Sequence, residues 1–469
     1  MPPTNRFFEA TIHDFQGGVL DKLAAESQRA DEVGRELTNS IKELSLRLDD
    51  FNGKLASLEE QMRHVEKRTA SLSYINMEYS ASLLHDNARS ARVLLIGWYG
   101  ANNCGDELML RTMLKHFEGK GVQLSVLLWD YVHYDVSDFP EFVQVLHYPP
   151  SIWHLQQLAS SFDVLVWGGG AILDDLQYTD DPFNYNTGNL YIRLSTMMLD
   201  RGKRVYSVGL SSNASFSSGE YVHKLARIVS ESEYFSLRDE FSVRAFRDAG
   251  METAKIHLCE DIVFGDPVLQ RSDLPRAHGK GKLVVGIVLF CFDGHTDHNI
   301  QLLSALGTYF HERGIDFEVK LIPFYDYYES DKCYLEMIRE RIGSPDWVSI
   351  AGYSSTIEEN AIFDCDAVIC YRYHAALLAG AKGIRSLFVC NDSHPHYPNK
   401  IAHLANLFDY QQNTVDESAL NESNFWAYFD KIMPPAPAPS VNNELFEEAD
   451  KWLESVCSSI AFSVKCTRE

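Results

Sequence analysis

The feature of this sequence that most constrains its fold is a series of short apolar runs, separated by helix-like segments, that occurs twice. The first series has apolar runs at residues 92–97, 124–129, 163–167 and 204–209. The second series has them at residues 282–290, 317–323, 367–370 and 386–390. Because strands that alternate with helices form parallel βαβ units, the sequence predicts an α/β protein with two Rossmann-like domains facing a cleft.

A heptad repeat precedes the first series. Residues 20–85 contain no proline, and apolar residues recur there at alternating spacings of four and three. These residues are Leu37, Ile41, Leu44, Leu48, Phe51, Leu55, Leu58, Met62 and Val65. A strict 3.5-residue repeat is typical of a coiled coil, so we expect an N-terminal coiled-coil helix that joins copies of the chain into a homo-oligomer. The alternative is a long helix that folds back on the rest of the chain.

These patterns divide the chain into four predicted parts. They are a helical coiled-coil extension at 1–88, an N-terminal Rossmann-like domain at 89–270, a C-terminal Rossmann-like domain at 271–432, and a proline-rich linker with a final helix at 433–469.

Charge and composition exclude several classes of protein. The formal net charge of -24 argues against a nucleic-acid partner, because neutralising phosphates needs a basic surface. Any anion site must therefore be a local group of arginines. No apolar run reaches the roughly 20 residues of a membrane span, and the first residues do not resemble a signal peptide. We expect a cytoplasmic protein with at most a peripheral membrane association; its nine scattered cysteines, without a CxxC pair, fit reduced thiols.

The turn after the first apolar run, at residues 97–107, is rich in glycine and asparagine and leads into a predicted helix. A helix N-terminus offers free N–H groups to a ligand, which makes Asn103 and Gly105 candidate substrate-binding residues. Asp106 stands where a phosphate-binding loop would have lysine, and the dinucleotide fingerprint is absent. Because Asp106 lies where a helix N-terminus meets the predicted cleft, it is a candidate catalytic residue, with helix capping as the alternative.

Two further loops follow predicted strands. Gly169 and Gly170 come at the end of the apolar run 163–167, where open α/β sheets bind ligands, so we expect a substrate to approach the backbone there. The alternative is a tight turn. Arg238 follows another short apolar stretch and is a candidate anion ligand, because its planar fork matches carboxylate and phosphate. The alternative for Arg238 is an ion pair with Asp239 or Glu240.

The segment at residues 371–374 ends one apolar run and opens a helix of small residues. Arg372 and His374 lie two positions apart, so in extended backbone both would project to the same side, toward the cleft. An arginine and a histidine at a helix N-terminus would form an anion site with a proton donor beside it.

Two histidine-containing loops could be interpreted as metal sites. They comprise Asp293, His295, Asp297 and His298 in one loop, and His394 with His396 in another. Neither has an established metal-ligand spacing, so we predict no metal and no cofactor.

Taken in order, these segments resemble the polysaccharide pyruvyl transferase family. The matching signatures are VLLIGWYGANNCGDE, VLVWGGGAILDD, SLRDEFSVRAFRDAG, LIPF and YRYHAALLAGAKG, which together cover about residues 92–405. The resemblance implies a GT-B-like fold and a transferase that moves pyruvate from phosphoenolpyruvate to a nucleotide- or lipid-linked sugar of a cell-surface polysaccharide precursor, forming a pyruvate ketal.

By motif position, the resemblance implies that Arg238 and Arg372 hold the donor's phosphate and carboxylate. His374 would protonate the enolpyruvyl methylene, and Asp106 would stabilise a cationic intermediate. The loop 391–397 departs from the family pattern, and Lys400, which follows it, is a further candidate substrate ligand. The motif Gly-Gln-Gly-Ile-Gly-Pro is replaced at 209–213.

Two other functions remain open at this point. One is a nucleotide-sugar glycosyltransferase of the same architecture, although the chain lacks a clear diphosphate-binding group. The other is a non-catalytic scaffold of a polysaccharide assembly complex, against which the presence of Arg238, Arg372 and His374 argues.

Overall fold

The computed structural model describes Lys42 and residues 92–129, 139–149, 152–175, 178, 187–212, 215–269, 281–291, 293–327, 330–391, 397–421, 423–433 and 443–465. The chain divides into two compact units, Met1–Glu78 and Tyr79–Glu469, and the description below concerns the second. The heptads predicted at Leu37 to Val65 lie outside the described residues.

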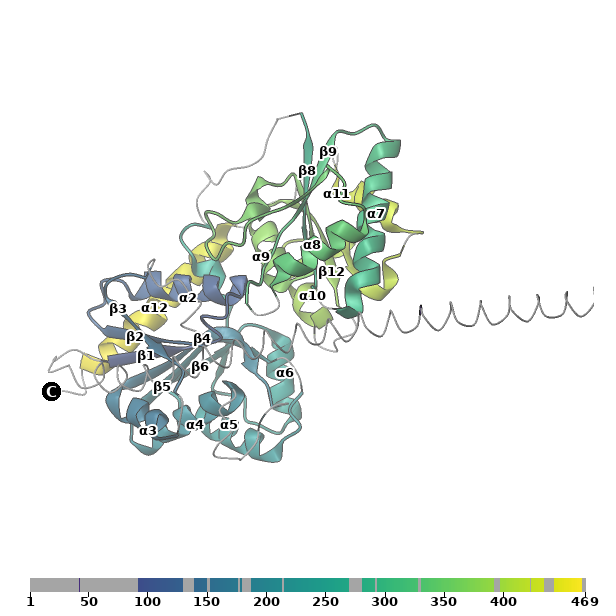
Figure 1. Cartoon of the computed structure of the whole chain (residues 1–469). Helices are drawn as coiled ribbons and strands as arrows, with labels where there is room; N and C mark the ends of the chain where they lie inside the picture. Colours follow the sequence, from purple (N-terminus) through teal and green to yellow (C-terminus); the bar gives the residue numbers. More distant parts are fainter. Residues whose placement is uncertain are drawn as a thin grey trace, which may run out of the picture. The chain divides into compact units, whose positions relative to one another are not determined.

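Among the described residues, the first sheet has seven strands, all parallel (Figure 1). Its order is β3-β2-β1-β4-β5-β6-β7. The strands are β1 (Arg92–Ile96), β2 (Gln123–Leu128), β3 (Val143–His147), β4 (Val164–Leu173), β5 (Arg204–Ser212), β6 (Tyr234–Leu237) and β7 (Ile256–Leu258). The strand order reverses between β1 and β4, and open α/β sheets bind ligands at such a switch point.

The second sheet repeats this plan in the described residues, with the order β10-β9-β8-β11-β12-β13. Its strands are β8 (Leu283–Val288), β9 (Phe317–Leu321), β10 (Val348–Ile350), β11 (Ala367–Cys370), β12 (Arg385–Cys390) and β13 (Thr414–Asp416). All of its pairs are parallel. The two parallel α/β sheets confirm the predicted fold class.

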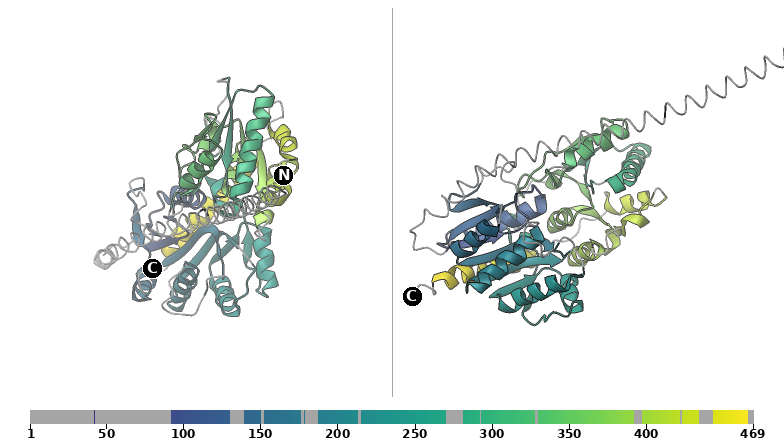
Figure 2. Two further views of the ribbon diagram at one scale, coloured as in Figure 1. Left: turned by 45° about the vertical axis from the view of Figure 1, so that its right-hand side comes forward. Right: turned by 60° about the horizontal axis from the view of Figure 1, so that its bottom comes forward.

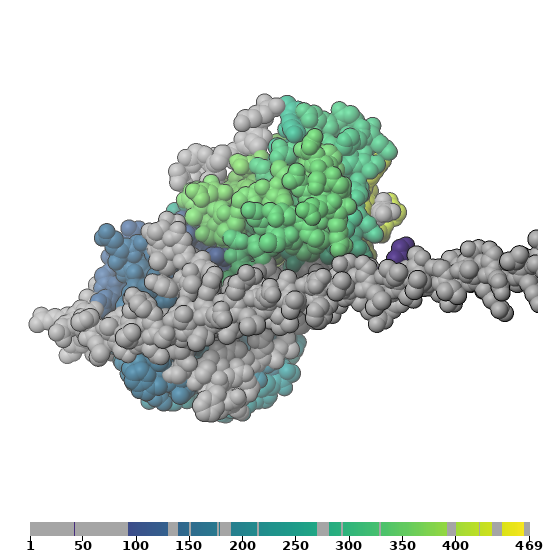
Figure 3. Space-filling model, viewed as in Figure 1, coloured from purple at the N-terminus to yellow at the C-terminus, as the bar shows by residue number. Residues whose placement is uncertain are grey.

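Helices cover both faces of the sheets. They are α2 (Cys104–Phe117), α3 (Ile152–Ser161), α4 (Thr187–Asp200), α5 (Gly219–Glu231), α6 (Glu240–Asp248), α7 (Thr296–Glu312), α8 (Asp331–Arg341), α9 (Tyr373–Ala381), α10 (Tyr397–Leu407), α11 (Phe425–Ile432) and α12 (Asn443–Lys465). Figure 1 shows α2 and α12 on one face of the first sheet and α3, α4 and α5 on the other. In the space-filling view of Figure 3, residues of the second domain, in green, form a continuous surface. None of the described helices combines the length and the apolar composition needed to cross a bilayer.

Strand β11 shows why the second sheet needs helices on both faces. Ala367 and Ile369 belong to one buried apolar cluster, and the alternate residues Val368 and Cys370 belong to another. Alternate side chains of a strand point to opposite faces, so both faces of β11 are apolar. The cluster that contains Val368 also contains the apolar residues of α2, and it therefore continues from one domain into the other.

The final helix, α12, packs on the first domain although it follows the second in sequence (Figure 2). Leu453 is fully buried and lies against Gly265, where an added Cβ would be 3.2 Å from its Cδ2. Trp452 Nε1 donates to Tyr234 Oη at 2.8 Å, and His116 lies 3.0 Å from Asp450. The predicted domain boundaries at 89–270, 271–432 and 433–469 remain predictions.

Strand β4 is longer than the sequence predicted. It continues through the three glycines to Leu173, with a register shift against β5 between Gly170 and Leu173. Gly169 and Gly170 have φ of 91° and 94°, a backbone conformation that other residues rarely adopt. The glycines therefore form an irregular part of the strand instead of a turn that ends it.

Candidate active site

The N-terminus of α2 lies where the two domains meet. Asn103 forms an isolated antiparallel bridge with Tyr325 of the second domain. The N–H of Cys104 donates to the Phe324 carbonyl at 2.9 Å. Because β1 leads into α2 at the switch point of the first sheet, this helix start is the position at which a ligand is expected.

His374 reaches this helix start from the second domain. A Cβ placed on Gly105 would lie only 1.9 Å from Nδ1 of His374. The absence of a side chain at residue 105 is therefore what allows the imidazole to lie against the backbone of α2. Gly105 and His374, both predicted as site residues, are brought together, although they are separated by about 270 positions in the chain.

Asp261, which is not among the site residues predicted from the sequence, connects Arg238 and His374. Its Oδ2 forms an ion pair with Arg238 Nη1 and lies 3.5 Å from His374 Nε2. The Asp261 side chain has no solvent exposure, and its Oδ1 accepts from the Val263 N–H at 2.9 Å. Burial alone would raise its pKa, but Arg238 and His374 hold the pKa of Asp261 well below its usual range. Asp261 is thus a buried carboxylate between two cationic or potentially cationic groups.

A sequence signal for Asp261 does exist. Arg238 directly follows β6, and Asp261 comes shortly after β7, the neighbouring strand. The carboxyl ends of parallel strands lie at the same edge of a sheet, so an acidic residue that follows β7 can lie near Arg238. Because β7 has only three residues, it is hard to recognise as a strand in the sequence, and the proximity of Asp261 to Arg238 is therefore hard to predict.

Arg238 is held on several sides, yet one of its polar atoms makes no hydrogen bond. Its guanidinium carbon lies 4.6 Å from the centre of the Tyr373 ring, a cation–π contact. Within the part of the chain that the structure describes, Arg238 Nε and His374 Nε2 are both buried without a hydrogen-bond partner. Buried polar atoms without a partner are rare in folded proteins. The predicted alternative, a pair of Arg238 with Asp239 or Glu240, is replaced by the pair with Asp261.

Asp106 and Lys400 complete the charged group from opposite domains. Burial, with the nearby Glu107, raises the pKa of Asp106 to about 8. Burial and the Arg238 guanidinium lower the pKa of Lys400, on α10, to about 7, although Asp106 is among the groups that oppose this shift. Both groups therefore change protonation near neutral pH, which suits proton transfer.

Arg372 has partners different from those of His374. Its Nε donates to the Leu289 carbonyl at 3.1 Å, and its Nη2 lies 2.7 Å from Asp331 Oδ1. The other oxygen of Asp331 accepts the N–H groups of Phe324 and Tyr325, both at 2.8 Å. Arg372 thus braces the loop that meets α2. The predicted common direction of Arg372 and His374 assumed extended backbone, whereas α9 begins at Tyr373.

The space over Gly169 and Gly170 is occupied by protein atoms. A Cβ on Gly169 would lie 2.7 Å from Ile262 Cδ1 and 2.9 Å from Met109 Sδ. A Cβ on Gly170 would lie 3.0 Å from Asp106 Oδ1. In the structure these glycines allow α2, with Asp106, to pack closely on β4. A contact of these glycines with the substrate stays a prediction.

The histidines of the first loop that we considered for a metal have protein partners. His295 Nδ1 lies 2.6 Å from Glu417, and His298 Nε2 lies 2.7 Å from the Tyr371 hydroxyl. The other pair, His394 and His396, lies outside the described residues.

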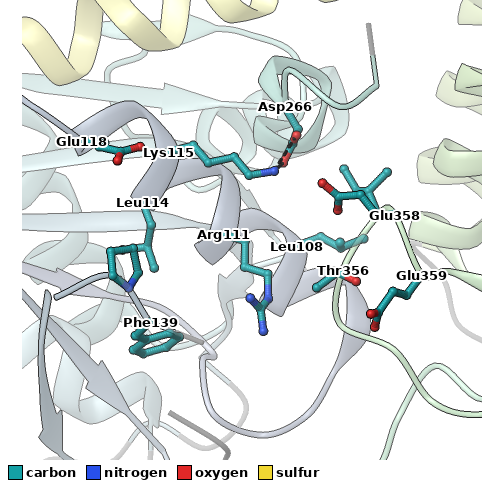
Figure 4. Close-up of a pocket in the computed structure, with 12 residues that line it drawn as sticks. Leu108, Arg111, Leu114, Lys115, Glu118, Phe139, Asp266, Thr356, Glu358 and Glu359 are labelled. Carbon is teal, nitrogen blue, oxygen red and sulfur yellow. Dashed lines mark hydrogen bonds and ion pairs between the residues drawn. The ribbon is translucent and has the colours of Figure 1, made fainter. Parts of the chain in front are cut away.

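A pocket of about 470 Å³ lies on a different side of α2 (Figure 4). Arg111 and Lys115 of α2 and the loop with Thr356 and Glu359 line it, and Lys115 pairs with Asp266 at 2.9 Å. Asp106 is absent from its lining. At 100° per residue, Arg111 and Lys115 lie roughly 140° and 180° around the helix from Asp106, so this pocket is separate from the charged group.

Comparisons with known proteins identify both the fold and the family. Curated protein sequences give no match. Among solved structures, a UDP-GlcNAc 2-epimerase from Methanocaldococcus jannaschii superposes with a TM-score of 0.50 at 10% identity, covering 78% of this chain and 99% of that one. MnaA of S. aureus, solved with UDP, gives 0.50 at 10% identity, with coverages of 78% and 96%. These likenesses show the two-domain, GT-B-like fold alone.

The family evidence comes from the sequence. The model of the polysaccharide pyruvyl transferase family matches residues 103–393, a span that begins at the helix start beside His374 and includes Arg238, Asp261 and Arg372. Lys400 lies beyond it. Because the match covers more than half of the chain, this protein belongs to the polysaccharide pyruvyl transferase family and is a transferase.

Proposed function

We propose that the protein transfers pyruvate from phosphoenolpyruvate to a sugar of a cell-surface polysaccharide precursor, forming a cyclic ketal and releasing phosphate. One observation carries this proposal most strongly. Arg238 Nε is a buried donor without a hydrogen-bond partner among the described residues. His374 Nε2 lies 3.5 Å from Asp261, the carboxylate that also pairs with Arg238. A small anion with an atom to be protonated would complete the bonding of Arg238 and lie within reach of the imidazole.

The donor is a multiply charged anion with a carboxylate and a phosphate. The chain as a whole has a net charge of -24, so only a local group of cationic side chains can attract the donor. Arg238 and Lys400 supply cationic groups at the carboxyl edge of the first sheet, and each influences the other electrostatically. Arginine is suited to carboxylate and phosphate because its planar fork donates two parallel hydrogen bonds. We assign the donor anion to Arg238 and Lys400.

His374 is the proton donor in this proposal. Burial lowers its pKa from the ordinary value, while the Asp261 carboxylate opposes that effect. The arriving donor anion would favour the imidazolium further, so the proton is in place when the donor is bound. His374 then gives its proton to the methylene carbon of the enol, while a sugar hydroxyl adds to C2. The product is a tetrahedral intermediate that still bears the phosphate.

Asp106 serves the second half of the reaction, while Lys400 stays with the phosphate as a cation. Asp106 in its ionised form takes the proton of the attacking hydroxyl, for which a pKa of about 8 is suitable. It passes this proton to the phosphate, which leaves with the electrons of its C–O bond, and the ionised Asp106 then faces the resulting cation. A second hydroxyl of the same sugar adds to C2 and gives its proton to His374, which restores the imidazolium and closes the ketal.

Arg372 has a positioning role in this scheme. The family resemblance implies a direct donor contact, but Leu289 and Asp331 occupy two of its nitrogens. Its contacts support a role in fixing the loop that pairs with Asn103 and Cys104, and thereby the placement of α2 beside His374.

Phosphate release from phosphoenolpyruvate tests the proposal. The purified protein is assayed with nucleotide-linked and lipid-linked sugars, together with the variants His374→Ala and His223→Ala. His223 is exposed on α5 and serves as the control. We expect release that depends on a sugar and is lost only in His374→Ala. Hydrolysis of a nucleotide-sugar without consumption of phosphoenolpyruvate would instead support the glycosyltransferase alternative.

A further inference from the structure

Two partly exposed tryptophans and a tyrosine with a buried hydroxyl lie together at the carboxyl edge of the first sheet. Trp98 comes shortly after β1, Trp129 directly follows β2, and Tyr148 directly follows β3. The rings of Trp98 and Trp129 are 5.0 Å apart with a tilt of 31°, and Tyr148 meets Trp129 edge-on at 4.6 Å. We infer that Trp98 and Trp129 form a platform on which the acceptor sugar stacks, an inference that rests on the proposed function.

The position of these residues in the sheet separates them from the donor groups. The strands run in the order β3-β2-β1-β4-β5-β6-β7, so the aromatic residues follow the first three strands of this order and Arg238 follows the sixth. Strands are spaced by about 4.8 Å, which puts the ends of β3 and β1 roughly 10 Å apart, enough for one or two pyranose rings. Asp106, at the switch point after β1, lies between the aromatic and the cationic sides.

The backbone holds the aromatic platform in place. The N–H of Trp129 donates to the Tyr99 carbonyl at 2.7 Å, and the N–H of Tyr148 donates to the Leu128 carbonyl at 3.1 Å. Tyr99, next to Trp98, is fully buried, and its hydroxyl donates to the Gly168 carbonyl in β4. The turn that carries Trp98 is therefore anchored to the same strand on which Asp106 packs.

The chemistry of this surface suits a neutral sugar better than the anionic donor. One face of a pyranose ring presents C–H bonds with partial positive charge, and these are attracted to the negative face of an indole ring. Tyr99 and Trp167 are fully buried in the core. Trp98 and Trp129 are instead partly exposed at the ligand-binding edge.

Saturation-transfer difference NMR with methyl pyranosides of glucose, galactose, mannose and N-acetylglucosamine tests the inference on the full chain. The variants are Trp98→Leu and Trp129→Leu, with Trp426→Leu as the matched control. Trp426 is also partly exposed, but it packs on Tyr309 and Arg313 in the second domain. We expect the dissociation constant of the bound sugar to rise roughly 3- to 10-fold in each platform variant and to stay unchanged in the control.

Two further measurements separate stacking from misfolding. Trp98→Phe keeps an aromatic face and should recover most of the affinity that Trp98→Leu loses. Phosphoenolpyruvate should raise the melting temperature of every variant, because Arg238 lies several strands away from the platform along the same edge of the sheet. Wild-type protein that binds none of the pyranosides, or platform variants that bind them with unchanged affinity, would overturn the inference. A failure of the proposed function can be distinguished from a failure of this inference. In that case phosphoenolpyruvate would neither stabilise the wild type nor release phosphate, regardless of whether the pyranosides bind.

Discussion

The substitution Gly105→Ala tests whether the contact between α2 and His374 is needed for catalysis. Gly105 lies in the first turn of α2, and its φ is not in the left-handed region. Alanine is therefore compatible with the backbone there and is a better helix former than glycine by about 1 kcal/mol. The added methyl group, however, would lie 1.9 Å from Nδ1 of His374. The helix can accept the substitution only if the imidazole moves.

The required displacement can be worked out from the structure. Ordinary van der Waals contact begins at 3.4 Å, so the ring must retreat by about 1.5 Å, the difference between 3.4 and 1.9 Å. Misplacement of a catalytic group by 1 Å can cost roughly 100-fold in rate. We therefore expect kcat to fall by about 100-fold or more in Gly105→Ala. The unfolding free energy should change by less than about 3 kcal/mol, the usual cost of overpacking.

Donor-dependent phosphate release measures this effect, and Gly219→Ala is the control. Gly219 begins α5, and an added Cβ there would meet no atom within 4 Å. This control should keep wild-type activity. If the loss in Gly105→Ala acts through His374, the double variant Gly105→Ala/His374→Ala should be no slower than His374→Ala alone, because the two changes affect one interaction.

A Gly105→Ala protein that keeps its activity within about threefold would refute the reasoning. It would mean that the imidazole does not need its place against the helix start. A double variant much slower than either single variant would also contradict it, because Gly105 would then act independently of His374.

Three further predictions follow from the same structure. Asp261→Asn should shift the alkaline limb of the pH profile of kcat/KM for the donor to lower pH. The reason is that the Asp261 carboxylate raises the pKa of His374, whose active form is the imidazolium. An unchanged profile would rule out this role. Arg372→Lys and Asp331→Asn should each destabilise the chain by about 1.5–3 kcal/mol in urea unfolding and should be strongly non-additive, whereas additive effects would show that the pair is not coupled. Leu453→Ala should lower the unfolding free energy by about 2–5 kcal/mol, since this side chain is fully buried against the first domain; a loss under about 1 kcal/mol would show that α12 contributes little there.

Much of the fold could be read from local sequence patterns. The predicted strand at 367–370 coincides with β11, and the helix predicted after the turn at 97–107 is α2. Parallel strands buried on both faces appear as short continuous apolar runs, so their positions follow from composition alone. The sequence patterns predicted an end of β4 that is too early, because three glycines suggested a turn, whereas the strand continues to Leu173.

The site was only partly predictable. Gly105, Arg238 and His374 are found in recognisable segments, and the structure brings them to one place. Asp261 follows a three-residue strand and lies in no distinctive motif, so its role was visible only from its contacts with Arg238 and His374. Arg372 lies in a recognisable motif, but its partners, the Leu289 carbonyl and Asp331, could be identified only from the structure.

The sequence by itself determined the two α/β domains, the family and the residue types of the active site, because each of these is expressed in local composition and motif order. Only the tertiary structure decided which of these residues face one another. Asp261 and Gly105 belong to one domain and His374 and Lys400 to the other, and their pairing depends on how the domains pack through α2. The depressed pKa of Lys400 and the raised pKa of Asp106 arise from burial and from neighbours distant in the chain, which no local pattern contains.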